Sequence, residues 1–143
     1  MKKGIDYIGV GVGAVISDDE GKYFLAKRGA GARNEAETWE FPGGGVELGD
    51  GLEDTIIREI REEYDINIRV DSFLCVFNHL IPDEHQHWVG LTYSCSIISG
   101  SPKICEPEKC DDIGWFTLEE MKTMNLSLIS VHDREILLSR GEK

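Results

Sequence analysis

The chain has 143 residues, of which 15 are basic and 27 acidic, so its formal net charge is −12. This length predicts a single domain over residues 1–143, and the negative charge argues against nucleic-acid polymers as partners because it repels their phosphates. The sequence holds no run of about 18 uncharged apolar residues and begins without the apolar core of a signal peptide. It therefore predicts no membrane span and a cytoplasmic location.

The first part of the chain predicts a strand, a second strand and a loop. Residues 8–16 alternate glycine with apolar side chains, which is typical of a strand that other backbone approaches closely. A turn at residues 18–21 then leads into residues 22–27, which we expect to pair with the first strand as a hairpin. A polar loop over residues 29–38 precedes the segment Trp39-Glu40-Phe41-Pro42-Gly43-Gly44-Gly45.

The remainder predicts a helix, further strands and a closing helix. Residues 52–64 contain neither glycine nor proline and have a helical pattern. Two β-rich runs, 66–81 and 88–98, flank a polar loop. His79, His85 and His87 lie around this loop, and we expect them at a pocket rim or facing the solvent. A short strand at 113–116, a short helix at 118–124 and a helix at 127–139 follow. Strands outnumber helices, so the sequence favours an α/β sandwich with a mixed, largely antiparallel sheet.

The four cysteines show no Cys-x-x-Cys spacing. Cys75 and Cys95 lie in apolar stretches, where a free thiol packs as a small hydrophobic group. Reduced, structural cysteines are therefore the simpler interpretation. The alternative is a zinc site, and it would use His85, His87, Cys105 and Cys110.

The most informative segment is the acidic helix at residues 52–64. At 100° per residue, Glu63 lies inside the apolar arc of this helix, Glu59 borders that arc and Glu62 is close by. Burying like charges together is costly unless a metal ion neutralises them. The segment before the helix contains five glycines, at positions 43, 44, 45, 49 and 51, whose backbone carbonyl oxygens could approach such an ion. Such ligands suit Mg²⁺ or Mn²⁺. The alternative is a solvated helix in which Arg58 and Glu62 form an ordinary pair four residues apart.

Residues 44–66 resemble the Nudix box, G-x5-E-x7-R-E-U-x-E-E-x-G-U, in which U is aliphatic. Arg58-Glu59-Ile60 matches R-E-U and Glu62-Glu63 matches E-E. Asp50 stands where the family has Glu, and Asp65 stands where it has Gly. Asp tolerates the left-handed conformation that ends a helix, so we expect that conformation at Asp65. The resemblance implies the Nudix α/β/α sandwich, with the box as a loop–helix–loop catalytic motif.

Two segments outside the box extend the resemblance. Residues 39–44 resemble the approach segment of MutT-type enzymes, and residues 106–110, followed by Trp115, resemble a smaller group of nucleoside triphosphate diphosphatases. They imply Mg²⁺-dependent cleavage of (deoxy)nucleoside triphosphates to monophosphate and pyrophosphate. An ADP-ribose or other nucleotide-sugar diphosphatase is one alternative, hinted at by Pro82. A non-catalytic nucleotide-binding module of the Nudix fold is another.

The resemblance also implies residue roles. The catalytic group is Arg58, Glu59 and Glu62, with Glu59 as the general base and Arg58 orienting it. The metal ligands are the Gly43 carbonyl, Glu59, Glu62, Glu63 and Glu108, with Glu106 as the rival of Glu108. Arg28 is expected to contact the substrate phosphate or base, and Phe41 and Phe77 to flank the base. The only other partner implied is a second copy of the chain, since family members frequently dimerise.

Overall fold

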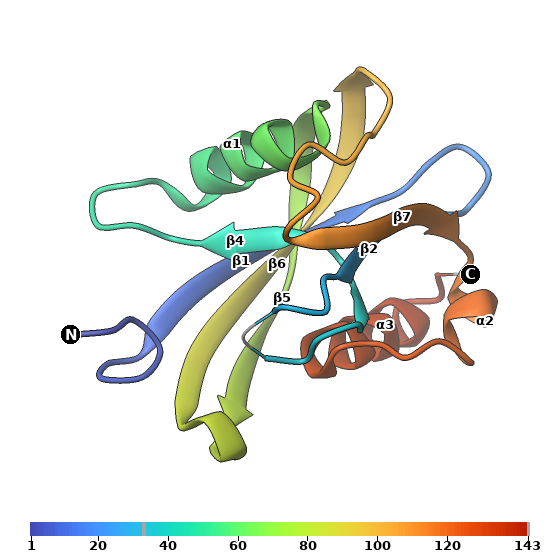
Figure 1. The fold of residues 1–143 in the computed structure, drawn as a ribbon. Coiled ribbons are helices and arrows are strands. Elements are labelled where there is room, and N and C mark those ends of the chain that lie inside the picture. Colours follow the sequence, from blue (N-terminus) through green and yellow to red (C-terminus); the bar gives the residue numbers. More distant parts are fainter. Residues whose placement is uncertain (33, 143) are drawn as a thin grey trace.

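The computed structural model describes residues 1–32 and 34–142; Arg33, inside the expected polar loop, and Lys143 lie outside the described residues. Four strands precede the first α-helix, further strands follow it, and two helices close the described part of the chain (Figure 1). In order, the elements are β1 (Gly9–Ile16), β2 (Tyr23–Arg28), β3 (Trp39–Glu40), β4 (Gly43–Gly45), α1 (Leu52–Tyr64), β5 (Asn67–Ile81), a 3₁₀ turn (Pro82–Glu84), β6 (Gln86–Ser99), β7 (Cys110–Phe116), α2 (Leu118–Met121) and α3 (Leu128–Ser139).

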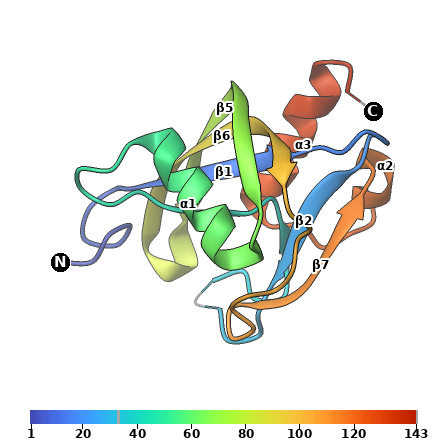
Figure 2. The same cartoon turned by 90° about the horizontal axis from the view of Figure 1, so that it is seen from above.

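The strands of the described residues form two sheets, ordered β4-β1-β6-β5 and β3-β2-β7. β1 runs parallel to β6, and every other pair of neighbouring strands is antiparallel. This confirms the mixed, largely antiparallel sheet. Figure 2 shows β2 and β7 running together on one side of the molecule, with the strands of the larger sheet beside them.

The expected hairpin between residues 8–16 and 22–27 is wrong. β2 belongs to the other sheet, and next to the turn a single bridge joins Ser17, which follows β1, to Tyr23. Both edges of β1 are already occupied, by β4 on one side and β6 on the other. A Cβ atom on Gly43 would lie 2.0 Å from the Val12 carbonyl oxygen, so the all-glycine strand β4 approaches β1 more closely than side chains would allow.

Helices cover the larger sheet on its two faces. α1 packs against β1, β4 and β5, whereas α3 packs against β5 and the short strand β3 on the opposite side (Figure 1). The side chains of β1 and β2 alternate between these layers: Val12 and Phe24 join the core under α1, and Val15 and Leu25 join the core near α3. The molecule is therefore an α/β/α sandwich, as the sequence predicted.

The helical predictions hold with small shifts at the ends. α1 spans residues 52–64 as expected, and Asp65 follows it in the left-handed conformation (φ 57°) with its N–H donating to the Arg61 carbonyl. α2 ends three residues earlier than expected, and α3 begins one residue later. The sequence did not predict β3 or β4, which are too short to show the alternation of apolar and polar residues that is typical of a strand. Within residues 1–32 and 34–142, no helix is both long and apolar enough to cross a membrane.

Candidate active site

A cavity of about 320 Å³ lies where three strands present glycines side by side. Gly11 on β1 is in register with Gly45 on β4 and with Gly90 on β6. All three line the cavity, so the row leaves its space free of side chains. We call this space the glycine-floored cavity. The glycine pattern of β1, read from sequence as a sign of close approach, thus creates room for a ligand.

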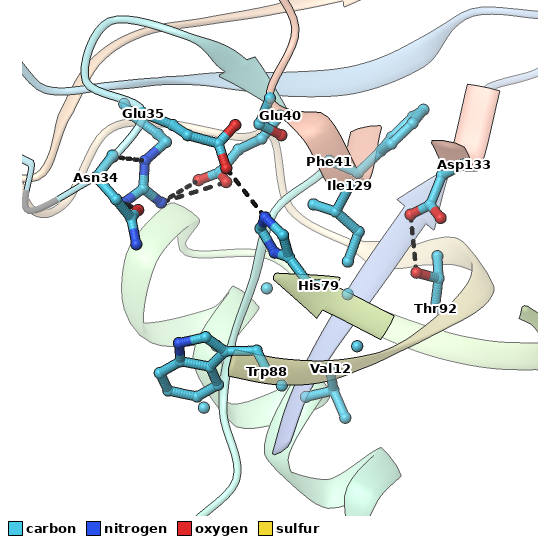
Figure 3. A pocket seen from close by; sticks show the side chains of 18 of the residues that line it. Val12, Asn34, Glu35, Glu40, Phe41, His79, Trp88, Thr92, Ile129 and Asp133 are labelled. Atoms are coloured by element: carbon cyan, nitrogen blue, oxygen red, sulfur yellow. Dashed lines mark hydrogen bonds and ion pairs between the residues drawn. The ribbon is translucent and has the colours of Figure 1, made fainter. Parts of the chain in front are cut away.

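The walls of the glycine-floored cavity combine apolar side chains with a few buried polar groups (Figure 3). Phe41, Trp88 and Ile129 supply apolar surface. Gln86, only 6% exposed, accepts hydrogen bonds at Oε1 from Trp88 Nε1 (2.9 Å) and Asn34 Nδ2 (3.2 Å). Its Nε2 has no hydrogen-bond partner among the described residues. A buried donor of this kind is costly unless a bound ligand or a water molecule supplies the acceptor.

Charged side chains surround the mouth of this cavity. Arg28 Nη1 lies 3.4 Å from both carboxylate oxygens of Glu40, and Arg28 Nη2 donates to Asn34 Oδ1 (2.9 Å). Glu35 lies 3.2 Å from His79 Nε2 and accepts a 2.7 Å hydrogen bond from the Leu128 N–H at the start of α3. Burial alone would raise the pKa of Glu35, but His79 and that N–H outweigh it and lower the pKa. The anionic Glu35 therefore ties the loop before β3 to β5 and α3.

A second cavity, of about 360 Å³, lies between the C-terminal end of α1 and the loop that precedes β7. Glu63, Glu106 and Glu108 line it, so we call it the acidic cavity. It shares three residues with the glycine-floored cavity, namely Arg28, Glu40 and Gly43. The two spaces are therefore neighbours joined at these residues, and an elongated ligand could extend from one into the other.

Negative charge is crowded in the acidic cavity. The pKa of Glu63 is raised to about 8, mainly by burial and also by the carboxylates of Glu59, Glu106 and Glu40, against a weaker opposing effect of Lys109. The pKa of Glu40 is also raised by burial, despite its ion pair with Arg28. Without a further positive charge these carboxylates resist ionising together.

The glutamates of α1 take up three different positions. Glu63 faces the acidic cavity, and the side chain of Glu62 is 56% exposed. Glu59 packs against the backbone of Gly44, because a Cβ atom added to Gly44 would lie 2.8 Å from Glu59 Cγ. Arg58 lies 3.6 Å from Glu59, 3.8 Å from Glu62 and 3.1 Å from Asp50. Asp50, shorter than the Glu of the family pattern, thus still reaches the arginine. Glu59 and Glu63 are half-buried and Glu62 is exposed, which agrees with the predicted arc in placing Glu63 on the inward side.

The residues of the acidic cavity fit a hard divalent cation. Their ligand atoms are carboxylate oxygens and the Gly43 carbonyl, which suit Mg²⁺ or Mn²⁺. The raised pKa of Glu63 marks a place where added positive charge would be favourable. These glutamates do not form a group of three whose ligand atoms lie within 4.8 Å of one another. A bound cation would relieve the mutual repulsion of these like charges.

The structure brings most of the predicted site residues to the two cavities. Arg28 lies at the junction and Phe41 lines the glycine-floored cavity, whereas Glu106 and Glu108 both reach the acidic cavity. The predicted catalytic residues Arg58, Glu59 and Glu62 line neither cavity. Phe77 also lines neither, and its ring lies 4.5 Å from that of His132, centroid to centroid. The four residues considered for zinc do not converge, and all four cysteines are free thiols.

Sequence reasoning missed the roles of several residues that line these cavities. Glu40 could have been found, because a glutamate between two aromatic residues just before Pro-Gly-Gly is an unusual place for a charge. His79 was expected at a rim but not as the partner of Glu35. Gln86 and Asp133 gave no signal, because only the tertiary fold brings β6 and α3 together.

Comparison with known proteins agrees with this geometry. The family model of the NUDIX domain matches residues 8–138 of the sequence. Over 71 residues, half of this chain and 54% of the relative, the sequence is 33% identical to an 8-oxo-dGTP diphosphatase of Escherichia coli (strain K12). Over 121 residues, 78% of this chain and 84% of the relative, it is 26% identical to nucleoside triphosphatase NudI of Enterobacter sp. (strain 638). The fold is similar to that of a MutT NUDIX hydrolase from Burkholderia pseudomallei, with a TM-score of 0.85 and 33% identity over 92% of this chain and 98% of that one.

Proposed function

This chain belongs to the NUDIX domain family of hydrolases, and from that premise we propose that it hydrolyses a (deoxy)nucleoside triphosphate to monophosphate and pyrophosphate with Mg²⁺ or Mn²⁺. The observation that carries the proposal is the pair of joined cavities. One is apolar with buried hydrogen-bonding groups, the other is acidic, and Arg28, Glu40 and Gly43 form their junction. A nucleotide has the same two-part character, with an apolar, hydrogen-bonding base and a charged phosphate chain.

The base would occupy the glycine-floored cavity. Trp88 and Phe41 offer aromatic surface to it, and a planar base packs well on such surface. The unpartnered Nε2 of Gln86 would donate to an acceptor atom of the ligand. Arg28 at the junction would contact the first phosphate and lead the chain toward the acidic cavity.

The side chains of α1 would then carry the hydrolysis. Bound divalent cations supply charge neutralisation on the phosphate chain and lower the pKa of a coordinated water. Glu63, Glu59 and the Gly43 carbonyl would hold them, together with Glu62 and with Glu108 or Glu106 from the loop before β7. Glu59 accepts the proton of the attacking water, and Arg58, 3.6 Å away, fixes the orientation of that carboxylate.

The hint for an ADP-ribose substrate gains no support from the geometry. Pro82 is exposed at the start of the 3₁₀ turn and lines neither cavity. The alternative of a non-catalytic binding module is disfavoured by the intact Arg58-Glu59 and Glu62-Glu63 pairs of the box. The triphosphate proposal is therefore the one that the site supports best.

A comparison of kcat/KM values tests it. We would assay canonical and oxidised deoxynucleoside triphosphates against ADP-ribose at the same Mg²⁺ concentration, and identify the products of the first turnover. We expect nucleoside monophosphate and pyrophosphate without orthophosphate, and no turnover after chelation of the metal. A preference of about tenfold or more for ADP-ribose, equivalent to about 1.4 kcal/mol, would overturn the choice of substrate. Tight nucleotide binding with no turnover of any substrate would overturn hydrolysis itself.

A further inference from the structure

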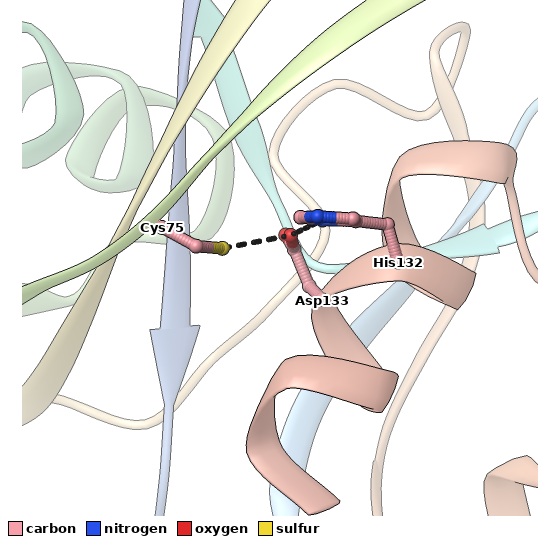
Figure 4. A group of neighbouring side chains, drawn as sticks. All are labelled: Cys75, His132 and Asp133. Atoms are coloured by element: carbon pink, nitrogen blue, oxygen red, sulfur yellow. Dashed lines mark hydrogen bonds and ion pairs between the residues drawn. The ribbon is translucent and has the colours of Figure 1, made fainter. Parts of the chain in front are cut away.

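Three potential metal ligands meet beside the glycine-floored cavity, away from the glutamates of the acidic cavity. They are Cys75 on β5 and the adjacent His132 and Asp133 on α3 (Figure 4). Among the described residues, this is the one group of three such side chains whose ligand atoms all lie within 4.8 Å of one another. The proposed hydrolysis assigns no role to Cys75 or His132.

The donor atoms are already arranged at nearly the separations of a coordination shell. Asp133 Oδ1 lies 3.2 Å from Cys75 Sγ and 3.0 Å from His132 Nδ1. Ligands of a tetrahedral zinc ion, with bonds of about 2.0–2.3 Å, lie about 3.3–3.8 Å apart. A small outward movement of each side chain would therefore make room for the ion among them.

The carboxylate of Asp133 is held by a further contact and lacks a strong counter-charge. Thr92 Oγ1 on β6 donates to Asp133 Oδ2 at 2.8 Å, and the strand register places Thr92 directly beside Cys75. Asp133 is 2% exposed, and no lysine or arginine nitrogen of the described residues lies within 4.0 Å of it. A buried carboxylate favours a cationic partner, and a hydrogen bond to its second oxygen orients it as a ligand.

We propose that Cys75, His132 and Asp133 form a second metal site, selective for a thiophilic divalent cation such as Zn²⁺. Sulfur and imidazole ligands favour Zn²⁺, whereas Mg²⁺ prefers the all-oxygen groups of the acidic cavity, so the two sites select different ions. On binding, the Cys75 thiol loses its proton to solvent and the thiolate bonds to the ion. Asp133 lines the glycine-floored cavity and Cys75 and His132 do not, so the proposed metal site would lie at the wall of that cavity.

Cobalt is the direct probe, because a thiolate bound to Co²⁺ gives a near-ultraviolet charge-transfer band that oxygen ligands do not give. The background for all variants is Cys105→Ser, which removes the exposed thiol next to Glu106. With Mg²⁺ in excess, we expect this protein to show the band at one Co²⁺ per chain and Zn²⁺ to abolish it. Cys75→Ser in the same background should lose the band while keeping a hydroxyl donor for Asp133, so that the fold survives.

Two further variants make the result decisive. Thr92→Val should keep the band but weaken Co²⁺ binding by about 10–100-fold, as expected when a ligand loses the group that orients it. Cys110→Ser, which changes a buried thiol lining the acidic cavity, should leave the band unchanged. A background protein without the band, a band that survives Cys75→Ser, or a band lost only in Cys110→Ser would each overturn the proposal. None of these measurements depends on turnover, so they stand whether or not the proposed hydrolysis does.

Discussion

The two cavities are built in different ways from the same chain. Three acidic residues of the acidic cavity come from two segments, the end of α1 with Glu63 and the loop before β7 with Glu106 and Glu108, while Arg28, Glu40 and Gly43 come from β2, β3 and β4. The glycine-floored cavity instead draws on β1, β4, β5, β6 and α3, which are spread over the whole chain. We infer that the proposed catalytic groups of α1 depend mainly on the local sequence of that helix, whereas recognition of the ligand depends on strand register and helix packing. Each prediction below tests one side of this contrast.

The largest effect is expected from the glutamates of α1. Glu59→Gln and Glu63→Gln should each lower kcat by at least about 100-fold, because each removes a base or a metal ligand. KM should change much less, since the glycine-floored cavity is untouched. Steady-state kinetics at saturating Mg²⁺ measure both values, and Glu53→Gln, exposed on the first turn of the same helix, is the matched control. Rates near that of the control for both variants would show that α1 is not the catalytic helix.

Two neighbouring glycines of β4, which both line the glycine-floored cavity, differ in whether they contact Glu59. A Cβ on Gly44 would lie 2.8 Å from Glu59 Cγ, so Gly44→Ala should displace this side chain and lower kcat by about 10–100-fold with little loss of stability. A Cβ on Gly45 meets nothing closer than 3.7 Å, so Gly45→Ala should leave kcat nearly unchanged. Kinetics and urea unfolding of the pair test the point, and equal kcat values for both would contradict it.

A smaller effect, on stability, is expected on the other side of the contrast. The pKa of Glu35 is lowered in the folded protein, so its contribution to stability is present above the ordinary pKa of 4.5 and is lost as the pH falls through the lowered value. Glu35→Gln should cost about 1–3 kcal/mol near neutral pH and progressively less in acid. Urea unfolding over this pH range measures the difference.

Glu37 provides the control for Glu35. It lies two residues away, also has a positive φ (64° against 46°), and is exposed. Glu37→Gln should therefore change stability by no more than about 0.5 kcal/mol at any pH. If the two variants lost the same amount, the contacts of Glu35 with His79 and α3 would not be what stabilises the loop.

The same contrast explains how much the sequence predicted. The bounds of α1, the inward position of Glu63 and the left-handed Asp65 follow from helical periodicity and local conformational preference. The partner of β1 did not follow, because nothing local shows that the glycines of β4 and β6 would occupy both of its edges. The sequence did not predict that Gln86 and Asp133 line a cavity for the same reason, since their surroundings are created by contacts between distant segments.

The smallest effect concerns the end of α1, where local preference alone decides the outcome. Asp65 has φ 57° and ψ 40°, a conformation that costs glycine almost nothing and other residues more. Asp65→Gly should therefore raise the free energy of unfolding by about 0.5–1 kcal/mol through the backbone. The variant also loses the exposed ion pair with Lys103 (3.5 Å), which contributes about 0–1 kcal/mol. We expect a net change between zero and a slight stabilisation in urea unfolding, with kcat unchanged. Lys103→Ala measures the ion pair by itself, and Asp65→Ala, which keeps a Cβ but loses the carboxylate, should be less stable than Asp65→Gly. If Asp65→Gly destabilised the protein clearly more than Lys103→Ala does, the aspartate side chain would stabilise this helix end through contacts other than the ion pair. Tertiary contacts would then outweigh local conformational preference at this position too.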